Sequence, residues 1–260
     1  MISKCWSWIG ACSTGSAHIK AGTVCQDFGS CIEVPCGEST ALIAIVSDGA
    51  GYAQFSSIGS RAVVRTMVRH LAEFVRSAWA SPIITEELAL QWLDDLRDRI
   101  FAIASRIDAK PRDFAATMVA AVVLPSGMTV CHVGDGACVA RRQGQQNWEV
   151  VSWPAHGEYA STTFFVTDNP VPDLRLTYCE GAVSDIAIFS DGLERLALDF
   201  ANKSACNRFF DPMSGPLTGL PPGRGRTLSG HLRKFLDGPQ VVERTDDDKT
   251  LIVAKRAVTR

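Results

Sequence analysis

The sequence predicts an α+β domain in which a mainly antiparallel sheet is layered with helices. Three observations lead to this fold class. Runs such as Ala41–Val46 and Ile186–Phe189 are short and aliphatic, as strands buried on both faces are. Between residues 56 and 108 the hydrophobic period changes to about 3.6 residues, which is typical of amphipathic helices. Strand-like runs then return, so strands and helices occur in blocks rather than in strict alternation.

The first block contains three strand candidates. Cys5–Ala11 is apolar enough for a strand, and Phe28–Val34 and Ala41–Val46 flank a hairpin. Asp27 precedes one hairpin strand and Asp48 follows the other. Because antiparallel neighbours run in opposite directions, both carboxylates are expected at the same end of the sheet.

Two helices are expected next. Residues 56–78 carry apolar side chains at helical spacing, and Pro82 ends this stretch. Thr85 is placed to cap a second helix that extends to about residue 108. We expect the two helices to pack antiparallel and to cover a sheet.

The second half of the chain returns mainly to strands. The expected strands are Phe114–Leu124, Met128–Arg141, Trp148–Trp153, Leu174–Cys179, Val183–Ser190 and Leu251–Lys255, and the expected short helices are Leu193–Phe200 and Thr227–Leu236. Residues 202–226 are rich in Pro and Gly, so we expect them to form an excursion over the surface. Since neither an internal repeat nor a linker is evident, residues 1–260 are predicted to form one domain.

Composition and charge limit the possible partners. The 260 residues are 46% hydrophobic and carry a formal net charge of −2, so neither nucleic acid nor an acidic membrane surface is expected to bind. No apolar run reaches the ~18 residues that a membrane span needs. The N-terminus, MISKCWSWIGACSTGS, lacks the apolar core of a signal peptide. Nine scattered cysteines without a CxxC pair indicate reduced thiols. We therefore expect a cytoplasmic protein, and a monomer.

Three aspartates follow apolar runs at or near the ends of expected strands. Asp48 and Asp191 each precede a glycine, and Asp135 lies between Gly134 and Gly136. A single Asp-Gly pair is more often a tight turn than a site. Its repetition favours a metal site built from carboxylates, where the glycines let backbone or ligand approach closely.

Five short motifs together resemble the PPM family of metal-dependent protein phosphatases, also called PP2C-type. They are Gln26-Asp27, Ser47-Asp48-Gly49-Ala50-Gly51, Val133-Gly134-Asp135-Gly136, Ser190-Asp191-Gly192 and Asp247-Asp248-Lys249-Thr250. Each is weak alone, but their order, spacing and strand-end placement are specific and cover nearly the full chain. The segments GSAHIKAGTVCQD, GEYASTTFF and TDDDKTLIVAKR look closer to a bacterial branch of the family. The resemblance implies a PP2C-like β-sandwich of two mainly antiparallel sheets flanked by helix pairs.

The resemblance also implies a set of metal ligands. Asp48 would bridge two cations, and the Gly49 carbonyl would bind one of them. Asp27 would act on one metal through its carboxylate or through water, while Asp191 and Asp247 would hold the other. Oxygen-only ligation suits Mn²⁺ or Mg²⁺ better than zinc or copper.

Two further assignments rest on the same resemblance. Asp135 would help Asp191 to bind a weaker third metal. Asp247 is chosen from the acidic triplet because it begins the match to the family's Asp-Asn-x-Ser/Thr pattern. Asp246 and Asp248 would then be solvated or lie behind the ligands.

The implied reaction is hydrolysis of phosphoserine or phosphothreonine on a protein, the substrate of a cognate Ser/Thr kinase. Two divalent ions ~3.5–4 Å apart would neutralise the phosphoryl oxygens and activate a bridging water, with Asp48 and Asp191 as the central carboxylates. No nucleophilic thiol is needed. Neither Cys25 nor Cys131 lies in a CX5R signature, the phosphate cradle of cysteine-dependent phosphatases.

Two positions depart from the family's pattern. Ala50 stands where many eukaryotic members have a histidine proposed as general acid, so the proton for the leaving group must come from elsewhere. Where many members have a phosphate-gripping arginine, the nearest candidate is His18, with Lys20 second. His18 either binds phosphate or is a structural histidine that satisfies loop backbone. His132 is expected in the core or on the face away from the acidic turn, and His156 in a loop.

Two other hypotheses stay open. The chain could be an inactive PP2C-like regulatory binding module, although clustered carboxylates without metal would repel one another. It could also be a phosphohydrolase acting on small phosphoesters or nucleotides, although it contains no P-loop. Residues 154–180 occupy the place of the family's variable flap, where specificity is expected.

Overall fold

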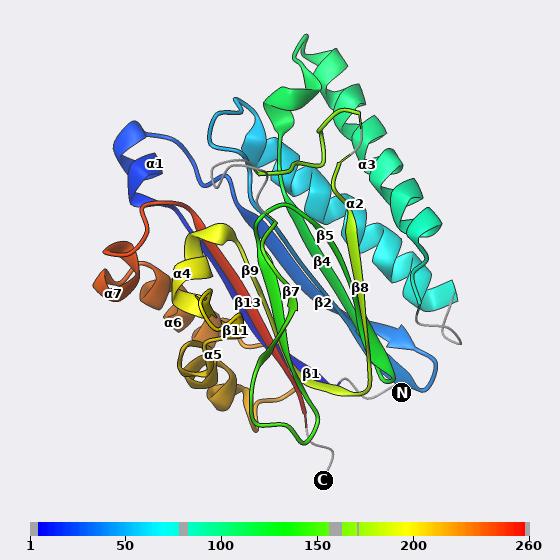
Figure 1. Ribbon diagram of the computed structural model, residues 1–260, viewed down its shortest axis with the longest axis vertical. Helices are drawn as coiled ribbons and strands as arrows, with labels where there is room; N and C mark the ends of the chain where they lie inside the picture. Colours follow the sequence, from blue (N-terminus) through cyan, green and yellow to red (C-terminus); the bar gives the residue numbers. More distant parts are fainter. Residues whose placement is uncertain (1–4, 78–82, 156–162, 171, 258–260) are drawn as a thin grey trace.

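Two β-sheets stack face to face, and helices lie on both outer sides of the stack (Figure 1). The computed structural model describes residues 5–77, 83–155, 163–170 and 172–257. Within the two large sheets all pairings are antiparallel except that of β12 with β1. The predicted fold, an α+β sandwich of two mainly antiparallel sheets flanked by helices, is thus confirmed.

The five-stranded sheet carries the predicted hairpin at its edge. Its strands, in spatial order, are β2 (Phe28–Cys36), β3 (Ser39–Ser47), β4 (Met118–Leu124), β5 (Gly127–Val133) and β8 (Arg175–Glu180). The central strands β3 and β4 are buried on both faces, which explains their unbroken aliphatic runs. Phe28 pairs with Ser47, so Asp27 and Asp48 lie at the same end of the sheet, as predicted.

The six-stranded sheet joins the two ends of the chain. Its strands, in spatial order, are β12 (Gly223–Arg224), β1 (Trp6–Ser13), β13 (Lys249–Arg256), β9 (Val183–Phe189), β6 (Ala137–Arg142) and β7 (Glu149–Ser152). β1 and β13 pair antiparallel along their full lengths, from Trp6–Arg256 to Ser13–Lys249. Residues that point inward from both sheets form a shared core, which includes Trp6 and Ile188.

The predicted helix pair covers the outer face of the five-stranded sheet. The pair consists of α2 (Ser56–Ser77) and α3 (Glu86–Arg106). The short helix α1 (Ser16–Ala21) precedes the pair in the sequence, and the 3₁₀ turn η1 (Pro111–Phe114) follows it. Met67 and Leu71 of α2 are buried in one core with Ile45 of β3. Thr85 caps α3 as predicted, because its hydroxyl accepts the N–H of Leu88 at 3.3 Å.

A second helical layer covers the six-stranded sheet. It contains η2 (Asp191–Leu193), α4 (Glu194–Ala197), α5 (Asn207–Ser214), η3 (Gly215–Leu217), α6 (Arg226–Leu236) and α7 (Pro239–Val242), with the small hairpin β10 (Leu198–Asp199) and β11 (Ser204–Ala205). The expectation that residues 202–226 form a surface excursion is wrong. α5 lies within this range and buries Phe209 and Phe210 against the sheet. The helix expected at Leu193–Phe200 is also shorter, since α4 gives way to β10.

The strand predicted over Met128–Arg141 is two strands in different sheets. β5 ends at Val133 and β6 begins at Ala137, and the turn between them carries the chain across the sandwich. Gly134 has a φ of +106°, and a Cβ there would lie 2.6 Å from Cγ2 of Thr117. Glycine is therefore required at this position, and it lets the turn place Asp135 between the two sheets.

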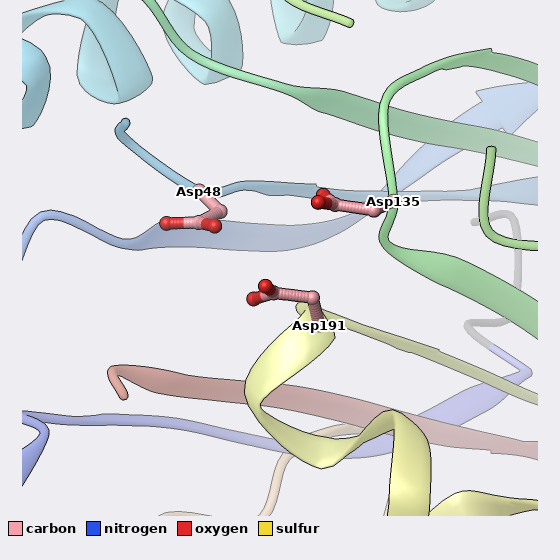
Figure 2. Close-up of side chains that lie close together, drawn as sticks. All are labelled: Asp48, Asp135 and Asp191. Atoms are coloured by element: carbon pink, nitrogen blue, oxygen red, sulfur yellow. The ribbon is translucent and has the colours of Figure 1, made fainter. Parts of the chain in front are cut away.

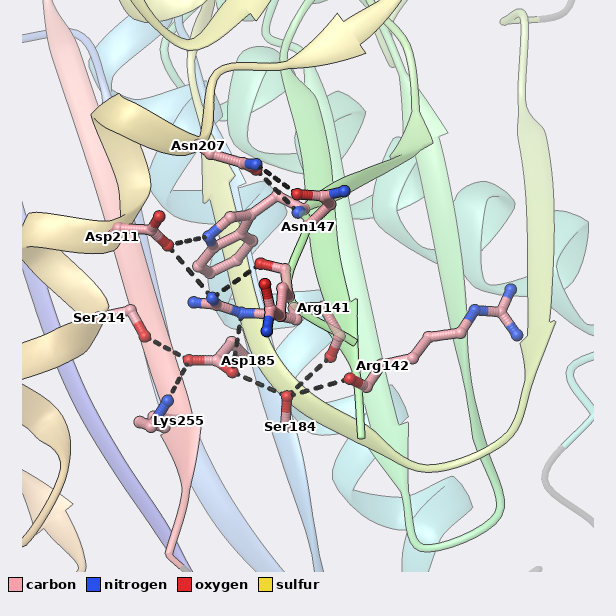
Figure 3. A network of polar contacts seen from close by, with 11 residues as sticks. Arg141, Arg142, Asn147, Ser184, Asp185, Asn207, Asp211, Ser214 and Lys255 are labelled. Carbon is pink, nitrogen blue, oxygen red and sulfur yellow. Dashed lines mark hydrogen bonds and ion pairs between the residues drawn. The ribbon is translucent and has the colours of Figure 1, made fainter. Parts of the chain in front are cut away.

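A buried polar network fastens the second helical layer to its sheet (Figure 3). Asp185 of β9 is 1% exposed. Its carboxylate accepts hydrogen bonds from Lys255 of β13 at 2.8 Å, from Ser184 at 2.8 Å and from Ser214 of α5. Arg141 Nε of β6 lies 3.3 Å from the same carboxylate. One side chain thus links three strands and a helix.

Some sequence-based expectations fall wholly or partly outside the described residues. His156 is one of them, as are residues 156–162 and 171 of the expected flap at 154–180. The end of that range, Arg175–Glu180, is strand β8. None of the helices in the described part of the chain has the length and apolar character to cross a membrane. The nine cysteines all lie in that part as free thiols.

Candidate metal centre

Asp48, Asp135 and Asp191 bring their carboxylates together at one end of the sandwich (Figure 2). One oxygen from each lies within 4.8 Å of the other two. Asp48 follows β3 of one sheet, Asp191 comes just after β9 of the other, and Asp135 lies in the turn that joins the sheets. The three strand-end aspartates singled out in the sequence therefore converge on one point.

The backbone of Asp48 is held by Thr117, the residue just before β4. Its N–H donates to Oγ1 of Thr117 at 3.0 Å, and the N–H of Thr117 donates back to the Asp48 carbonyl at 2.8 Å. Ser47 Oγ also donates to the Thr117 carbonyl at 2.6 Å. A Cβ at Gly49 would lie 2.8 Å from Cβ of Ser56, so only glycine fits there. These contacts fix the direction in which the Asp48 carboxylate points.

Asp27 adjoins Asp48 and is 4% exposed. Ser190 Oγ donates to Asp27 Oδ2 at 2.7 Å and accepts the N–H of Thr250 at 2.9 Å. Asp27 Oδ1 is buried and lacks a hydrogen-bond partner among the described residues. Ser190 therefore orients one oxygen of Asp27 and leaves the other available to a ligand.

Burial and mutual repulsion raise the pKa values of these carboxyl groups. Burial raises the pKa of Asp27 to about 6. Burial also raises the pKa of Asp48 well above its usual range, and the charges of Asp27 and Asp191 raise it further. For Asp191, burial raises the pKa first, and the charges of Asp135 and Asp247 add to it. So many carboxylates in one buried place are unfavourable without a compensating positive charge.

A hard divalent cation fits this donor set. Oδ1 of Asp27 and Oδ1 of Asp191 are buried without hydrogen-bond partners in the described part of the molecule. Carboxylate oxygens are the ligands that Mg²⁺ and Mn²⁺ prefer, and the two orphaned oxygens would be satisfied by coordination.

The acidic triplet before β13 divides into different environments. Asp247 is half-buried and close enough to Asp191 to raise the pKa of that carboxyl group. Asp246 is exposed, whereas Asp248 is 1% exposed. The choice of Asp247 as the metal ligand of this triplet stays a prediction.

His18 is paired with Asp248 rather than placed in the aspartate cluster. Its Nδ1 lies 3.0 Å from Oδ1 of Asp248. The same carboxylate accepts the N–H of Gly15 at 2.6 Å and of Gln26 at 2.5 Å. His18 thus belongs to a set of contacts that holds the loop leading to Asp27, which is the structural role considered from the sequence. Its phosphate-binding role stays a prediction.

His132 lies in the core, as expected. It is 0% exposed, and its Nδ1 lies 2.7 Å from Ser152 Oγ and 3.1 Å from a guanidinium nitrogen of Arg175. Burial, and then the charge of Arg175, lowers the pKa of His132 to about 3. The ring is therefore neutral at physiological pH and has a packing role.

Several residues around the centre were not identified from the sequence. Thr117 and Ser190 position the ligands. A serine directly precedes Asp48 and Asp191, and this was the available signal for Ser190. Arg195 and Arg244 line a polar cavity of about 240 Å³ together with Asp191 and Asp247. Their closeness in sequence to two predicted ligands was the only hint of this arrangement.

Comparison with known proteins gives a consistent result. The family model described as Protein phosphatase 2C matches residues 14–237. Serine/threonine-protein phosphatase 3 of Escherichia coli (strain K12) is 31% identical over 251 residues, which is 96% of this chain and 98% of that protein.

Solved structures show the same fold at lower sequence identity. PppA of Pseudomonas aeruginosa has a TM-score of 0.62 at 16% identity, covering 98% of this chain and 99% of that one. The catalytic domain of the phosphatase PstP, solved in complex with two manganese ions, has a TM-score of 0.58 at 15% identity, covering 98% and 100%.

Proposed function

The chain belongs to the protein phosphatase 2C family, and on this premise we propose that it hydrolyses phosphoserine and phosphothreonine on proteins with two divalent cations. The observation that carries the proposal is the convergence of Asp48, Asp135 and Asp191 within 4.8 Å. The Escherichia coli relative is named a serine/threonine-protein phosphatase, and the PstP structure contains manganese, which supports the reaction and the choice of Mn²⁺ or Mg²⁺.

The proposed ligands come from strand ends and one turn. They are Asp27, Asp48, the carbonyl of Gly49, Asp191 and Asp247 for the two main cations, and Asp135 with Asp191 for a weaker third. Asp48 would help to hold both main cations, because its carboxyl group is close enough to Asp27 and Asp191 for their charges to raise its pKa.

When bound, the cations would neutralise phosphoryl oxygens and supply an activated water. The protein's own residues provide the geometry. Thr117 and Ser190 hold Asp48 and Asp27 in place through the hydrogen bonds described above. Arg195 and Arg244 would bind anionic groups of the substrate by charge-assisted hydrogen bonds in the adjoining cavity. The substrate would be a phosphoprotein made by a Ser/Thr kinase, and the phosphatase would act as a monomer.

The test is turnover of a phosphothreonine peptide in EDTA, Mg²⁺ or Mn²⁺. We expect metal-dependent turnover in the wild type and a loss of at least about 10²-fold in kcat in Asp48→Asn and Asp191→Asn, because each variant removes a charge that holds the cations. Asp98→Asn, an exposed position on α3, is the matched control and should keep full activity.

Two other outcomes would favour the rival functions. A folded wild type that binds Mn²⁺ and phosphopeptide without turnover would indicate a regulatory binding module. Rapid turnover of small phosphoesters with no activity on phosphopeptides would indicate a small-molecule phosphohydrolase. Either result would contradict the proposal.

A further inference from the structure

A second site lies outside the aspartate cluster, at the edge of the six-stranded sheet. Arg224 of β12 and Arg226 and Arg233 of α6 line one cavity of about 530 Å³, whose opposite wall is β1. We call it the arginine cavity. None of the clustered aspartates lines it. We propose that the arginine cavity binds a phosphate group, either as the free ion or as part of a phosphorylated ligand.

The positive charges of Arg224, Arg226 and Arg233 are not compensated by acidic groups in the described cavity lining. No carboxylate is among the described residues that line the cavity. Ion pairs of Arg224, Arg226 or Arg233 are likewise missing from the described part of the chain. Arg224 donates one long hydrogen bond, of 3.4 Å, to the Gly10 carbonyl. Like charges gathered around a hollow repel one another, and an anion would relieve this repulsion.

The lining of the arginine cavity offers several hydrogen-bond donors. Guanidinium groups bind phosphate in a bidentate manner, and the exposed side chains of three arginines line this cavity. Ser229 also lines the cavity and is 7% exposed. Its Oγ accepts the N–H of Gly10 at 3.3 Å, so the hydroxyl proton is not used in that bond. The first turn of α6 carries no acidic side chain that would repel an anion.

The arginine cavity has room for a ligand larger than phosphate. Gly230 is exposed, and a Cβ added there would meet nothing within 4 Å, so no neighbouring group crowds this part of the cavity lining. A second cavity of about 190 Å³, between β1, β13 and β2, shares Gly10, Cys12 and Arg224 with the first. A phosphate held by the arginines therefore leaves room for the rest of a larger ligand.

The experiment measures binding of inorganic phosphate to the metal-free protein in EDTA, by NMR titration of ¹⁵N-labelled chain. Without cations the aspartate cluster does not attract phosphate, so failure of this proposal is separate from failure of the phosphatase proposal. We expect saturable binding, with the largest amide shifts at Gly10, Ser229 and Gly230.

Arg226→Gln/Arg233→Gln should weaken phosphate binding by at least about tenfold, because two charge-assisted contacts are lost. Arg65→Gln/Arg99→Gln, exposed on α2 and α3, removes the same charge elsewhere and should leave binding unchanged. Absence of saturable binding in the wild type, or equal binding in the Arg226→Gln/Arg233→Gln variant, would overturn the proposal.

A second arm identifies the source of the phosphate. A phosphothreonine peptide is titrated beside its unphosphorylated form, again without metal. Binding of the phosphopeptide that requires Arg226 and Arg233 would assign the site to a phosphorylated ligand. Binding of inorganic phosphate alone would assign it to the free ion. Both results support the cavity as a phosphate site.

Discussion

Ser190 shows how one hydroxyl group sets the geometry of the metal centre. It precedes Asp191, donates to Asp27 and accepts from the backbone of Thr250, so it joins β9, β13 and the loop before β2. Groups that orient metal ligands in this way affect metal affinity nearly as strongly as the ligands themselves.

Ser190→Ala should therefore reduce Mn²⁺ affinity by about 10–100-fold, because Asp27 loses the contact that orients it. The buried N–H of Thr250 also loses its partner, which should destabilise the fold by about 1–3 kcal/mol. Mn²⁺ titration and urea unfolding measure the two effects. Ser77→Ala, whose hydroxyl contacts only its own helix in the described structure, is the control. Unchanged Mn²⁺ affinity in Ser190→Ala would contradict the role given to this residue.

At the scale of residues, the sequence was sufficient to locate the clustered aspartates but not the residues that form hydrogen bonds with them. Asp48, Asp135 and Asp191 stand out because glycine follows each one at a strand end. Thr117 has no such signature, and the position of Ser190 before Asp191 does not reveal its contacts, since both roles arise from contacts between distant segments. The burial of Asp248 beside exposed Asp246 likewise depends on which N–H groups the folded loops bring near.

At the scale of elements, the approach of α2 to η1 requires a glycine. A Cβ at Gly59 would lie 2.1 Å from the carbonyl oxygen of Phe114. Thr117 lies between η1 and β4, and its hydroxyl accepts a hydrogen bond from the backbone N–H of Asp48. The packing of α2 on η1 therefore supports the site indirectly.

Gly59→Ala should destabilise the protein by about 1–3 kcal/mol, because a methyl group is forced into a close backbone contact. Gly230→Ala on α6 is the matched substitution, since nothing lies within 4 Å of its Cβ. There the ordinary helix preference of Ala over Gly should stabilise the protein by about 1 kcal/mol. Thermal and urea unfolding would show opposite signs for the two variants. A stabilising Gly59→Ala would contradict the described contact.

Helices and strands were predictable from the sequence where the hydrophobic pattern of a segment matches its position in the folded protein. The hairpin of β2 and β3 and the helix pair of α2 and α3 have clear hydrophobic patterns, and Thr85 caps α3. The turn at residues 134–136, where the chain crosses from one sheet to the other, was not predicted. The apolar residues on both sides of this turn form a pattern typical of one continuous strand. α5 was missed because the Pro and Gly around it outweighed Phe209 and Phe210.

At the scale of the whole molecule, Asp185 connects helix α5 to the six-stranded sheet, whose strand β9 ends just before Asp191 (Figure 3). Burial alone would raise the pKa of Asp185, but hydrogen bonds from Lys255, Ser214 and Ser184 outweigh burial and lower the pKa below its usual value. Because the folded pKa is below that of the unfolded chain, the charged carboxylate stabilises the fold at neutral pH. This contribution is lost as the pH falls through the folded pKa.

Asp185→Asn should destabilise the protein by about 3 kcal/mol near pH 6, since it leaves Lys255 and Arg141 without their buried partner. The difference from wild type should shrink below about pH 4, where the carboxyl group begins to protonate in the unfolded chain. Urea unfolding at a series of pH values measures this difference. Asp98→Asn is the exposed control. A penalty that stays constant from pH 6 to pH 3 would contradict the account.

Binding of Mn²⁺ to the purified protein measures whether the aspartate cluster holds at least two divalent cations. Free Mn²⁺ is followed by electron paramagnetic resonance during titration of the wild type and Asp48→Asn. We predict two tight sites per chain in the wild type, with a weaker third, and loss of the tight pair in the variant, because Asp48 is proposed to contribute to both tight sites. Wild-type protein that binds no Mn²⁺, or an Asp48→Asn variant with the same tight sites, would contradict the account.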